Sequence, residues 1–246
     1  MSKVVVITAA SKGIGAATAL AFGKAGYDVV LNYKNDTAAA KAVVRKIDQL
    51  GQKAIMVQAD VFTPAGIDTL FAEVAKHFPK IDVFVNNAAD PSEPKFGDYT
   101  LQDVASSLNA NFGATVLCTQ AAAQLMETGC ILFVSSIYGL PFAGNPSLIL
   151  YSASKAAMIN FAQTTAEKLA PKIRCNVVAP GTTRTPSWDG VADEYVQTSL
   201  GMTLQKEWVE PEEIADALVF LAATPHITAQ TITVDAGWQK KIRPVS

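Results

Sequence analysis

Short apolar runs alternate with longer stretches of helical periodicity from one end of the chain to the other. The apolar runs are too continuous for half-exposed strands and indicate a sheet that is covered on both faces. We predict seven strands, at residues 3–8, 28–32, 54–58, 83–85, 131–135, 174–178 and 231–234. Alanines, leucines and charged residues recur at helical spacing between them, which predicts helices near 13–25, 37–50, 65–77, 101–126, 150–170 and 211–223.

This alternation of strand and helix predicts an α/β fold, a Rossmann-type doubly wound parallel sheet of about seven strands with helices on both faces. The 246 residues show no low-complexity linker and no internal repeat, so we expect a single domain over 1–246. Ligands of such sheets bind at the carboxyl ends of the strands. Residues 186–210, the only long stretch without a clear core pattern, are expected to form a flap over that site.

Composition narrows the class of protein further. Half of the residues are hydrophobic, 17% are charged and the formal net charge is −2, with no basic stripe that would favour nucleic acid. No window reaches the roughly 20 apolar residues of a membrane helix, and the N-terminal apolar run is too short for a signal peptide. The three cysteines lack paired spacing and are expected to be buried free thiols. We expect a cytoplasmic protein with no nucleic-acid, membrane or metal partner.

A glycine-containing turn joins the first predicted strand to the first predicted helix. Glycines at such a junction let a pyrophosphate approach the helix N-terminus, where free N–H groups and the helix dipole favour anions. A plain turn would look the same, but the position at the start of a βαβ unit favours dinucleotide binding. The turn reads Thr8-Ala9-Ala10-Ser11-Lys12-Gly13-Ile14-Gly15.

The sharpest chemical signal is Tyr151 followed four residues later by Lys155, in the predicted helix 150–170. Residues four apart share one helix face. A phenol with a pKa of about 10 is a weak acid and base near neutrality, and a neighbouring ammonium favours its ionised form. We therefore expect Lys155 to lower the pKa of Tyr151, and Tyr151 to exchange a proton with a substrate oxygen. Tyr138 has no lysine four residues later and is the weaker candidate.

These motifs resemble those of the short-chain dehydrogenase/reductase family, whose patterns are Thr-Gly-x-x-x-Gly-x-Gly and Tyr-x-x-x-Lys. The resemblance spans almost the whole chain and is closest to members similar to 3-oxoacyl carrier-protein reductases. It implies that the Ser136 hydroxyl bonds the substrate oxygen and that Asn111 kinks a helix and holds a water. Ser135 and Asn109 are their neighbouring alternatives. The implied catalytic residues are Asn111, Ser136, Tyr151 and Lys155.

The resemblance also implies a nicotinamide cofactor, whose positively charged ring would likewise favour the ionised form of Tyr151. The end of the second strand favours NADP(H). NAD sites usually have a carboxylate there, on the adenosine ribose hydroxyls, whereas this chain has Tyr33 and then Lys34. Lys12 faces the same region in family members that prefer NADP. Two cations fit a phosphate, although both could be ordinary solvated lysines. Asp36 lies past the strand and is interpreted as a helix N-cap.

Further cofactor contacts follow from the resemblance at the other strand ends. Asp60 accepts from the adenine amino group, and Thr185, after the turn at 180–182, bonds the nicotinamide carboxamide unless this segment is simply a turn. The implied cofactor-binding residues are Thr8, Ala10, Ser11, Lys12, Gly13, Ile14, Gly15, Tyr33, Lys34, Asp60, Val61, Asn87, Ala88, Ala89, Tyr151, Lys155, Pro180, Gly181, Thr182 and Thr185.

Alanine replaces the family's glycine at four positions: Ala9, Ala89, Ala229 and Ala236. An alanine would be strained at any of them that requires a positive φ. The sequence alone gives no physical reason why four such positions share this change.

The leading hypothesis is an NADP(H)-dependent ketoreductase that acts on a small-molecule carbonyl or alcohol. The alternatives are an NAD-linked alcohol or sugar dehydrogenase and a non-catalytic NADP(H)-binding regulatory protein; the complete Asn–Ser–Tyr–Lys set favours an active enzyme. The aromatic and acidic flap favours an uncharged substrate, although its aromatic residues would equally serve to pack the flap. Family members usually form tetramers or dimers through helices near 101–126 and 150–170 and the C-terminal strand, so a homo-oligomer is expected.

Overall fold

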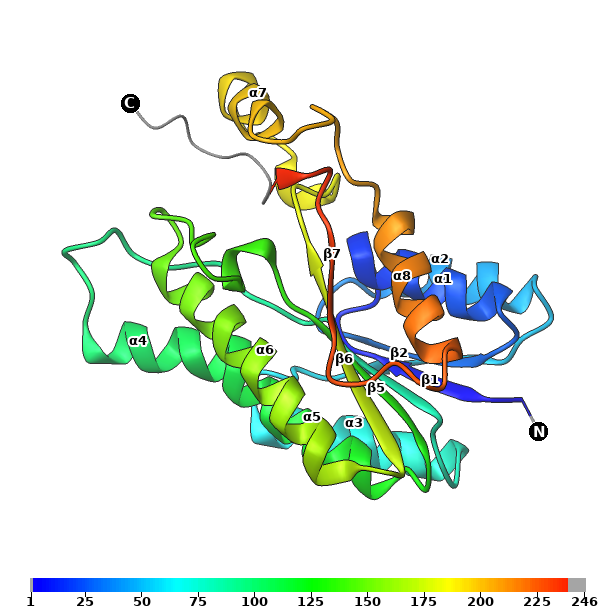
Figure 1. Cartoon of the computed structure of the whole chain (residues 1–246). Coiled ribbons are helices and arrows are strands. Elements are labelled where there is room, and N and C mark those ends of the chain that lie inside the picture. The colour runs from blue at the N-terminus through cyan, green and yellow to red at the C-terminus, as the bar shows by residue number, and fades with distance from the viewer. Residues whose placement is uncertain (1, 239–246) are drawn as a thin grey trace.

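Seven parallel strands form one sheet in the computed structural model, which describes residues 2–238 (Figure 1). Their order is β3-β2-β1-β4-β5-β6-β7, so the chain winds outward in both directions from the β1–β4 pair. This confirms the predicted doubly wound sheet and places the switch point of the winding at that pair. The strands are β1 (Val4–Ile7), β2 (Asp28–Tyr33), β3 (Ala54–Gln58), β4 (Val83–Asn86), β5 (Gly129–Val134), β6 (Ile173–Pro180) and β7 (Thr231–Val234).

Helices cover both faces of the sheet, as predicted (Figure 1). Successive residues of a strand point to opposite faces. Val4 and Val6 of β1 therefore join a core with α3, α5 and α6, while Val5 and Ile7 join a second core with α1, α2 and α8. The helices are α1 (Gly13–Lys24), α2 (Thr37–Asp48), α3 (Pro64–His77), α4 (Leu101–Leu108), α5 (Ala114–Gln124), α6 (Ile149–Leu169), α7 (Asp193–Gly201) and α8 (Pro211–Ala223).

Two regions differ from the predicted pattern. The helix expected over 101–126 is divided by a π-helical turn, Asn109–Gly113, which contains the asparagine expected to kink it. Segment 186–210 contains the helix α7, which the sequence did not reveal because Ser199 and Leu200 are its only buried residues. A helix with so little buried surface shows no apolar stripe. Residue 1 and residues 239–246 of the predicted domain lie outside the described residues.

The three cysteines are buried and free, as predicted. Burial raises the pKa of Cys118 and of Cys175 to about 12. Both thiols therefore stay protonated near neutrality. Within residues 2–238, no helix combines the length and the apolar character needed to cross a bilayer.

Three of the four alanines at the family's glycine positions adopt a positive φ: Ala9 at 51°, Ala229 at 58° and Ala236 at 52°. This left-handed conformation is strained for a residue with a Cβ. Ala89 is not among the residues with a positive φ. The family's glycine therefore matches a backbone with positive φ at three of the four positions. At position 89 nothing in the structure explains the difference from the family.

Replacing Ala9 with glycine is expected to raise the free energy of unfolding by about 1 kcal/mol. The change relieves strain at a positive φ, and no buried contact is lost because Ala9 is exposed. Urea-induced unfolding measures the difference. Ala89→Gly is the matched control, since Ala89 is also exposed without a positive φ, and there the flexible glycine is expected to lower stability by about 0.4–1 kcal/mol. Equal changes at both positions would contradict the assignment of strain to Ala9.

Candidate active site

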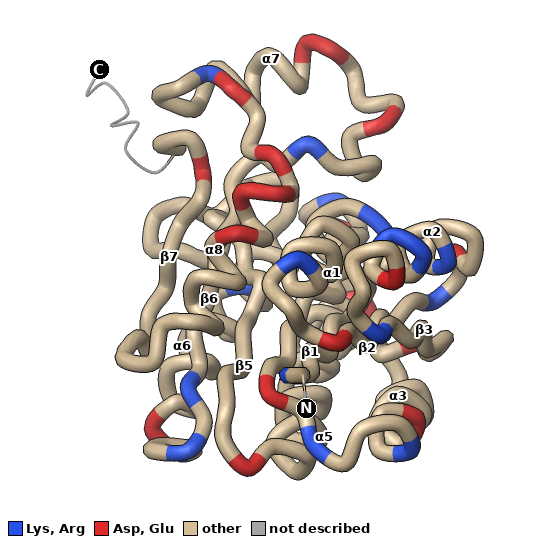
Figure 2. The backbone as a smooth tube through the Cα atoms, turned by 90° about the vertical axis from the view of Figure 1, so that its right-hand side faces the viewer, with Lys and Arg blue, Asp and Glu red and all other residues tan. Residues whose placement is uncertain are grey.

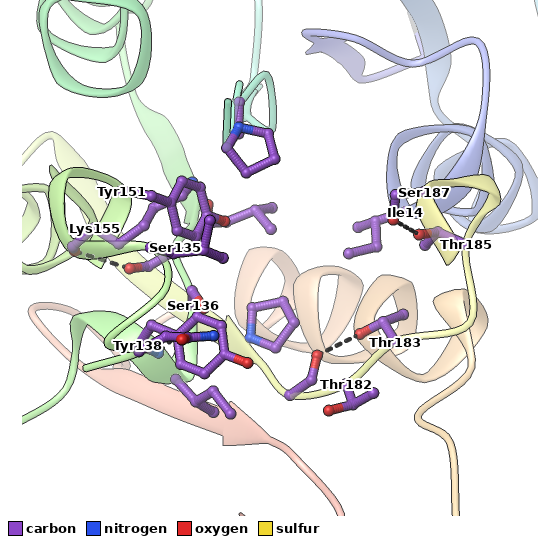
Figure 3. Close-up of a pocket in the computed structure, with 18 of the residues that line it drawn as sticks. Ile14, Ser135, Ser136, Tyr138, Tyr151, Lys155, Thr182, Thr183, Thr185 and Ser187 are labelled. Carbon is purple, nitrogen blue, oxygen red and sulfur yellow. Dashed lines mark hydrogen bonds between the residues drawn. The ribbon is translucent and has the colours of Figure 1, made fainter. Parts of the chain in front are cut away.

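A cavity of about 370 Å³ opens at the carboxyl ends of the strands (Figure 3). The turn that begins α1 lies on one side of it, and the start of α6 lies on the other. Many of the predicted site residues meet here, although they are far apart in the sequence. Those that line the cavity are Ile14, Asn87, Ala89, Ser136, Tyr151, Lys155, Pro180, Gly181, Thr182 and Thr185.

Tyr151 and Lys155 lie on the same side of α6, as their spacing predicts. The Lys155 Nζ atom is 5.5 Å from the centroid of the Tyr151 ring and donates to the carbonyl oxygen of Val134 at 2.8 Å. The Ser136 hydroxyl faces the cavity and accepts from the backbone N–H of Tyr138 at 3.1 Å. Ser136, Tyr151 and Lys155 therefore converge from a strand end and from one helix face (Figure 3).

Ser135, the alternative to Ser136, has a structural partner. Its hydroxyl donates to the backbone carbonyl of Lys155 at 2.9 Å, inside the protein. This bond joins the end of β5 to α6. The 3₁₀ turn Ile137–Gly139 packs closely against α6 at Lys155. A Cβ on Gly139 would lie only 2.6 Å from the Lys155 carbonyl carbon. The close approach explains why the chain has glycine at 139.

Burial dominates the protonation of Tyr151 and Lys155, the two candidate catalytic groups. Desolvation raises the pKa of Tyr151 above its ordinary value, and the hydrogen bond with Ser136 lowers it only in part. Desolvation also lowers the pKa of Lys155 to about 7. In the protein without cofactor, burial therefore raises the pKa of Tyr151. The lowering expected from Lys155 together with a bound nicotinamide ring stays a prediction. Tyr151 is held as a neutral phenol, which is the form that can donate a proton.

The glycine-containing turn of residues 8–15, the predicted phosphate turn, is built on close backbone packing. Gly13 adopts a φ of 54°, and a Cβ on Gly15 would collide with the carbonyl oxygen of Ala9 and lie 2.7 Å from the Asn87 Nδ2 atom. Asn87 Nδ2 in turn donates to the Thr8 carbonyl at 2.9 Å, and the Thr8 hydroxyl accepts from the Asn87 N–H at 2.9 Å. The predicted residues Thr8, Gly15 and Asn87 thus form one connected structure.

Comparison with known proteins decides the family. The model of a short-chain dehydrogenase family, described as enoyl-(acyl carrier protein) reductase, matches residues 8–239. A 3-oxoacyl-(acyl-carrier-protein) reductase of Synechocystis sp. is 37% identical over 243 residues, 96% of each chain. The chain belongs to the short-chain dehydrogenase/reductase family. This membership confirms the predicted class of enzyme, an oxidoreductase that acts on hydroxyl and carbonyl groups.

Solved structures of short-chain dehydrogenases agree with the assignment. A short-chain dehydrogenase from Burkholderia cenocepacia, solved in complex with NADP, superposes with a TM-score of 0.87 at 33% identity, covering 96% of this chain and 98% of that one. An acetoin dehydrogenase from Enterobacter cloacae gives a TM-score of 0.90 at 28% identity, covering 100% and 99%. The whole fold is thus that of the short-chain dehydrogenases, with no added domain in the described residues.

The residues predicted to bind the adenosine half of the cofactor lie outside the cavity lining. Lys34 Nζ pairs with the Asp60 carboxylate at 2.8 Å. Burial raises the pKa of Asp60, but the hydrogen bonds from Lys34 and from a backbone N–H lower it more, so the carboxylate stays ionised. Asp36 caps α2 by accepting from the Ala39 N–H at 2.9 Å, as predicted. The predicted residues outside the cavity lining are Thr8, Ala10, Ser11, Lys12, Gly13, Gly15, Tyr33, Lys34, Asp60, Val61, Ala88 and Asn111.

Asn111 is fully buried and is not among the residues that line the cavity. Its side-chain amide donates to the Asp90 carbonyl at 2.7 Å, and its side-chain oxygen accepts from the Asp90 N–H at 2.8 Å. The π-helical turn thus holds the loop that follows β4. The water-binding role implied by the family resemblance stays a prediction.

Sequence reasoning missed Asn32, which supports the phosphate turn from β2. Asn32 is buried, its Oδ1 accepts from the Ala9 N–H at 3.1 Å, and its Nδ2 donates to the carbonyls of Val57 and Ala59 at 3.3 and 3.0 Å. It therefore ties the turn to two strands. An asparagine inside an apolar strand is the signal that would have found it, because buried polar side chains need partners.

The aromatic residues of segment 186–210 both line the cavity and pack against each other. Trp188 and Tyr195 line the cavity, and the Trp188 ring contacts Trp208 edge to face at 5.0 Å between centroids. Arg184 lies over Trp208 and pairs with Glu210 at 2.8 Å. Both interpretations therefore apply: these aromatic residues form part of the cavity wall, and they also pack the segment.

Proposed function

We propose that this protein is an NADP(H)-dependent ketoreductase that transfers hydride between NADP(H) and a carbonyl or secondary-alcohol substrate. The observation that carries the proposal is the convergence of Ser136, Tyr151 and Lys155 on one cavity beside the phosphate turn. The Burkholderia relative solved with NADP and the relatives named as 3-oxoacyl reductase and acetoin dehydrogenase support the same class of reaction.

The residues present fit a dinucleotide. Gly15 lets the turn pack closely on the start of α1, since a Cβ there would collide with the Ala9 carbonyl, and the N–H groups of the helix start favour an anion such as a pyrophosphate. Lys12 and Lys34 would hold the 2′-phosphate, while Lys155 would hold the ribose hydroxyls. The remaining cofactor residues implied by the family resemblance keep the roles given above.

The protein's own groups account for the proton transfer. NADP(H), when bound, supplies or accepts the hydride. The Ser136 hydroxyl and the Tyr151 phenol would both hydrogen-bond the substrate oxygen. In the reducing direction Tyr151 gives its Oη proton to that oxygen while the carbonyl carbon is reduced, and in the oxidising direction it recovers the proton. A neutral phenol is the correct starting form for reduction.

The cavity suits an uncharged substrate. Of the described residues that line it, Lys155 alone carries a formal charge, and the substrate side presents Tyr138, Leu148, Trp188 and Val191. Acidic residues gather around α7 and the start of α8 (Figure 2). An anionic substrate would therefore approach against like charge. Segment 186–210 would act as the flap over such a substrate.

The proposed assembly is a homo-oligomer, a dimer or tetramer, in the cytoplasm. Leu117 on α5 and Phe220 on α8 are exposed apolar residues outside the cavity, which supports contact with further copies of the chain. The buried free thiols support a reducing compartment. The molecular mass in solution tests the assembly, and a monomeric mass would contradict it.

A carbonyl panel with NADPH and with NADH tests the function directly. The panel should contain pairs that differ in one charge, such as 4-acetylbenzoic acid and its methyl ester. We expect turnover with NADPH, with a kcat/KM on the order of tenfold higher for the neutral member of each pair, because one like charge within a Debye length costs about 1 kcal/mol or more. Tight NADPH binding without turnover of any compound would instead favour the regulatory alternative.

A further inference from the structure

The helix that carries Tyr151 and Lys155 begins without a cap of its own. Its N-cap residue is Leu148, which makes no side-chain hydrogen bond to the helix start. The first N–H groups of any α-helix lack partners within the helix. The first intrahelical bond here runs from the Ser152 N–H to the Leu148 carbonyl, so the N–H groups of the three residues before Ser152 need other acceptors.

Glu93, in the loop between β4 and α4, supplies those acceptors. Its Oε1 atom accepts from the N–H of Ile149 at 2.7 Å and more weakly from that of Leu150 at 3.4 Å. Its Oε2 atom accepts from the N–H of Tyr151 at 3.0 Å. One carboxylate from more than fifty residues away therefore caps the first turn of α6, and one of its bonds is to the catalytic tyrosine itself.

A second side chain holds this carboxylate in place. The Tyr99 hydroxyl donates to Glu93 Oε1 at 2.6 Å, and the Tyr99 ring packs edge to face on Phe96. The hydrogen bond with Glu93 raises the pKa of Tyr99 to about 12. Burial raises the pKa of Glu93, but the bonds from Tyr99 and the α6 backbone lower it more. Near neutrality Glu93 therefore stays ionised and Tyr99 stays protonated, as these hydrogen bonds require.

We propose that Glu93 is a positioning residue for Tyr151, which anchors the first turn of α6 so that the phenol faces Ser136 and the cavity. The inference rests on the proposed function, because Tyr151 must be the proton donor for its position to matter. Asn111 fixes the same loop at Asp90, three residues earlier. The π-helical turn and the start of the catalytic helix are therefore joined through a single short stretch of chain.

This role differs from that of an ordinary helix cap. The helix has 21 residues and is packed along its length, so losing its first-turn bonds leaves the remainder folded. The first turn, however, contains the reacting group. A misplacement of about 1 Å in such a group can cost on the order of a hundredfold in rate. Removal of Glu93 is therefore expected to reduce catalysis far more than stability.

Glu93→Ala tests the proposal. We expect kcat to fall on the order of tenfold to a hundredfold, with the KM for NADPH and the NADPH dissociation constant unchanged. Glu93→Gln, which keeps one acceptor oxygen, should give an intermediate kcat. The exchange rate of the Tyr151 amide hydrogen, measured by NMR on the protein without cofactor, should rise at least tenfold in Glu93→Ala, since a free N–H at a helix start exchanges more readily.

Glu213→Gln is the matched control. Glu213 accepts from the Glu210 N–H at 2.7 Å at the start of α8, so the variant weakens the same kind of bond at a helix outside the site. It should leave kcat and the Tyr151 amide exchange unchanged. An unchanged exchange rate in Glu93→Ala, or an equal fall of kcat in the control, would overturn the proposal. If the wild-type protein turns over no carbonyl compound, the proposed function fails, while faster exchange in Glu93→Ala still supports the anchor.

Discussion

Tyr151→Phe is expected to lower kcat by about three orders of magnitude and to leave the NADPH dissociation constant almost unchanged. The phenylalanine ring keeps the packing at the start of α6 but has no hydroxyl to give a proton to the substrate oxygen. Burial raises the pKa of this phenol, so the wild-type group is protonated and ready to donate near neutrality. Steady-state kinetics on a neutral ketone and a fluorescence titration with NADPH measure the two quantities.

Tyr27→Phe is the control for this variant. Tyr27 is also buried with a raised pKa, but it packs against Phe22 at the far end of α1 and is outside the cavity. Loss of its hydroxyl should not alter kcat. Tyr138 lines the same cavity as Tyr151 and offers the alternative donor. If Tyr138→Phe abolishes turnover and Tyr151→Phe does not, the proton donor has been assigned to the wrong tyrosine.

Lys34→Asp is expected to change the ratio of NADPH to NADH affinity by about a hundredfold, in favour of NADH. Charge-assisted hydrogen bonds contribute about 1.5–3 kcal/mol, and the variant both removes such a donor and places an anion beside the 2′-phosphate. The new carboxylate can also accept from the ribose hydroxyls of NADH. The Lys34–Asp60 pair is partly exposed, with 53% of the lysine side chain accessible, so its loss costs the fold little.

Dissociation constants for both cofactors, measured at one ionic strength, test this prediction. Lys168→Asp carries the same change of charge at the exposed C-terminal end of α6, the end of the helix away from the cavity. It should leave the ratio unchanged. An unaltered ratio in Lys34→Asp would mean that Lys34 serves only its ion pair with Asp60, and the 2′-phosphate contact would have to be sought elsewhere.

Local signals predicted most of the fold and the centre of the candidate site. Continuous apolar runs located the strands because a sheet covered on both faces has no polar alternation. The spacing of Tyr151 and Lys155 placed them on one helix face without any knowledge of the fold. The predicted phosphate turn was recognisable because glycine and a helix start occur together in one short stretch.

The parts that escaped prediction depend on contacts between distant segments. Glu93 lies in a loop without periodicity, and its partners are backbone N–H groups that any sequence would offer. Asn32 could have been suspected, but its partners on the phosphate turn and β3 follow only from strand order. The pKa of Tyr151 depends on how completely the folded chain excludes water, which spacing does not measure.

Trp188 has two roles in the structure, and together they constrain how the substrate range of this protein can change. The same ring forms part of the cavity wall and packs on Trp208, which in turn lies under Arg184. A mutation at Trp188 that widens the cavity therefore also loosens the packing of segment 186–210. Val191 and Leu148 line the cavity with aliphatic side chains. New substrate ranges are more accessible to evolution through those two aliphatic positions than through the tryptophan.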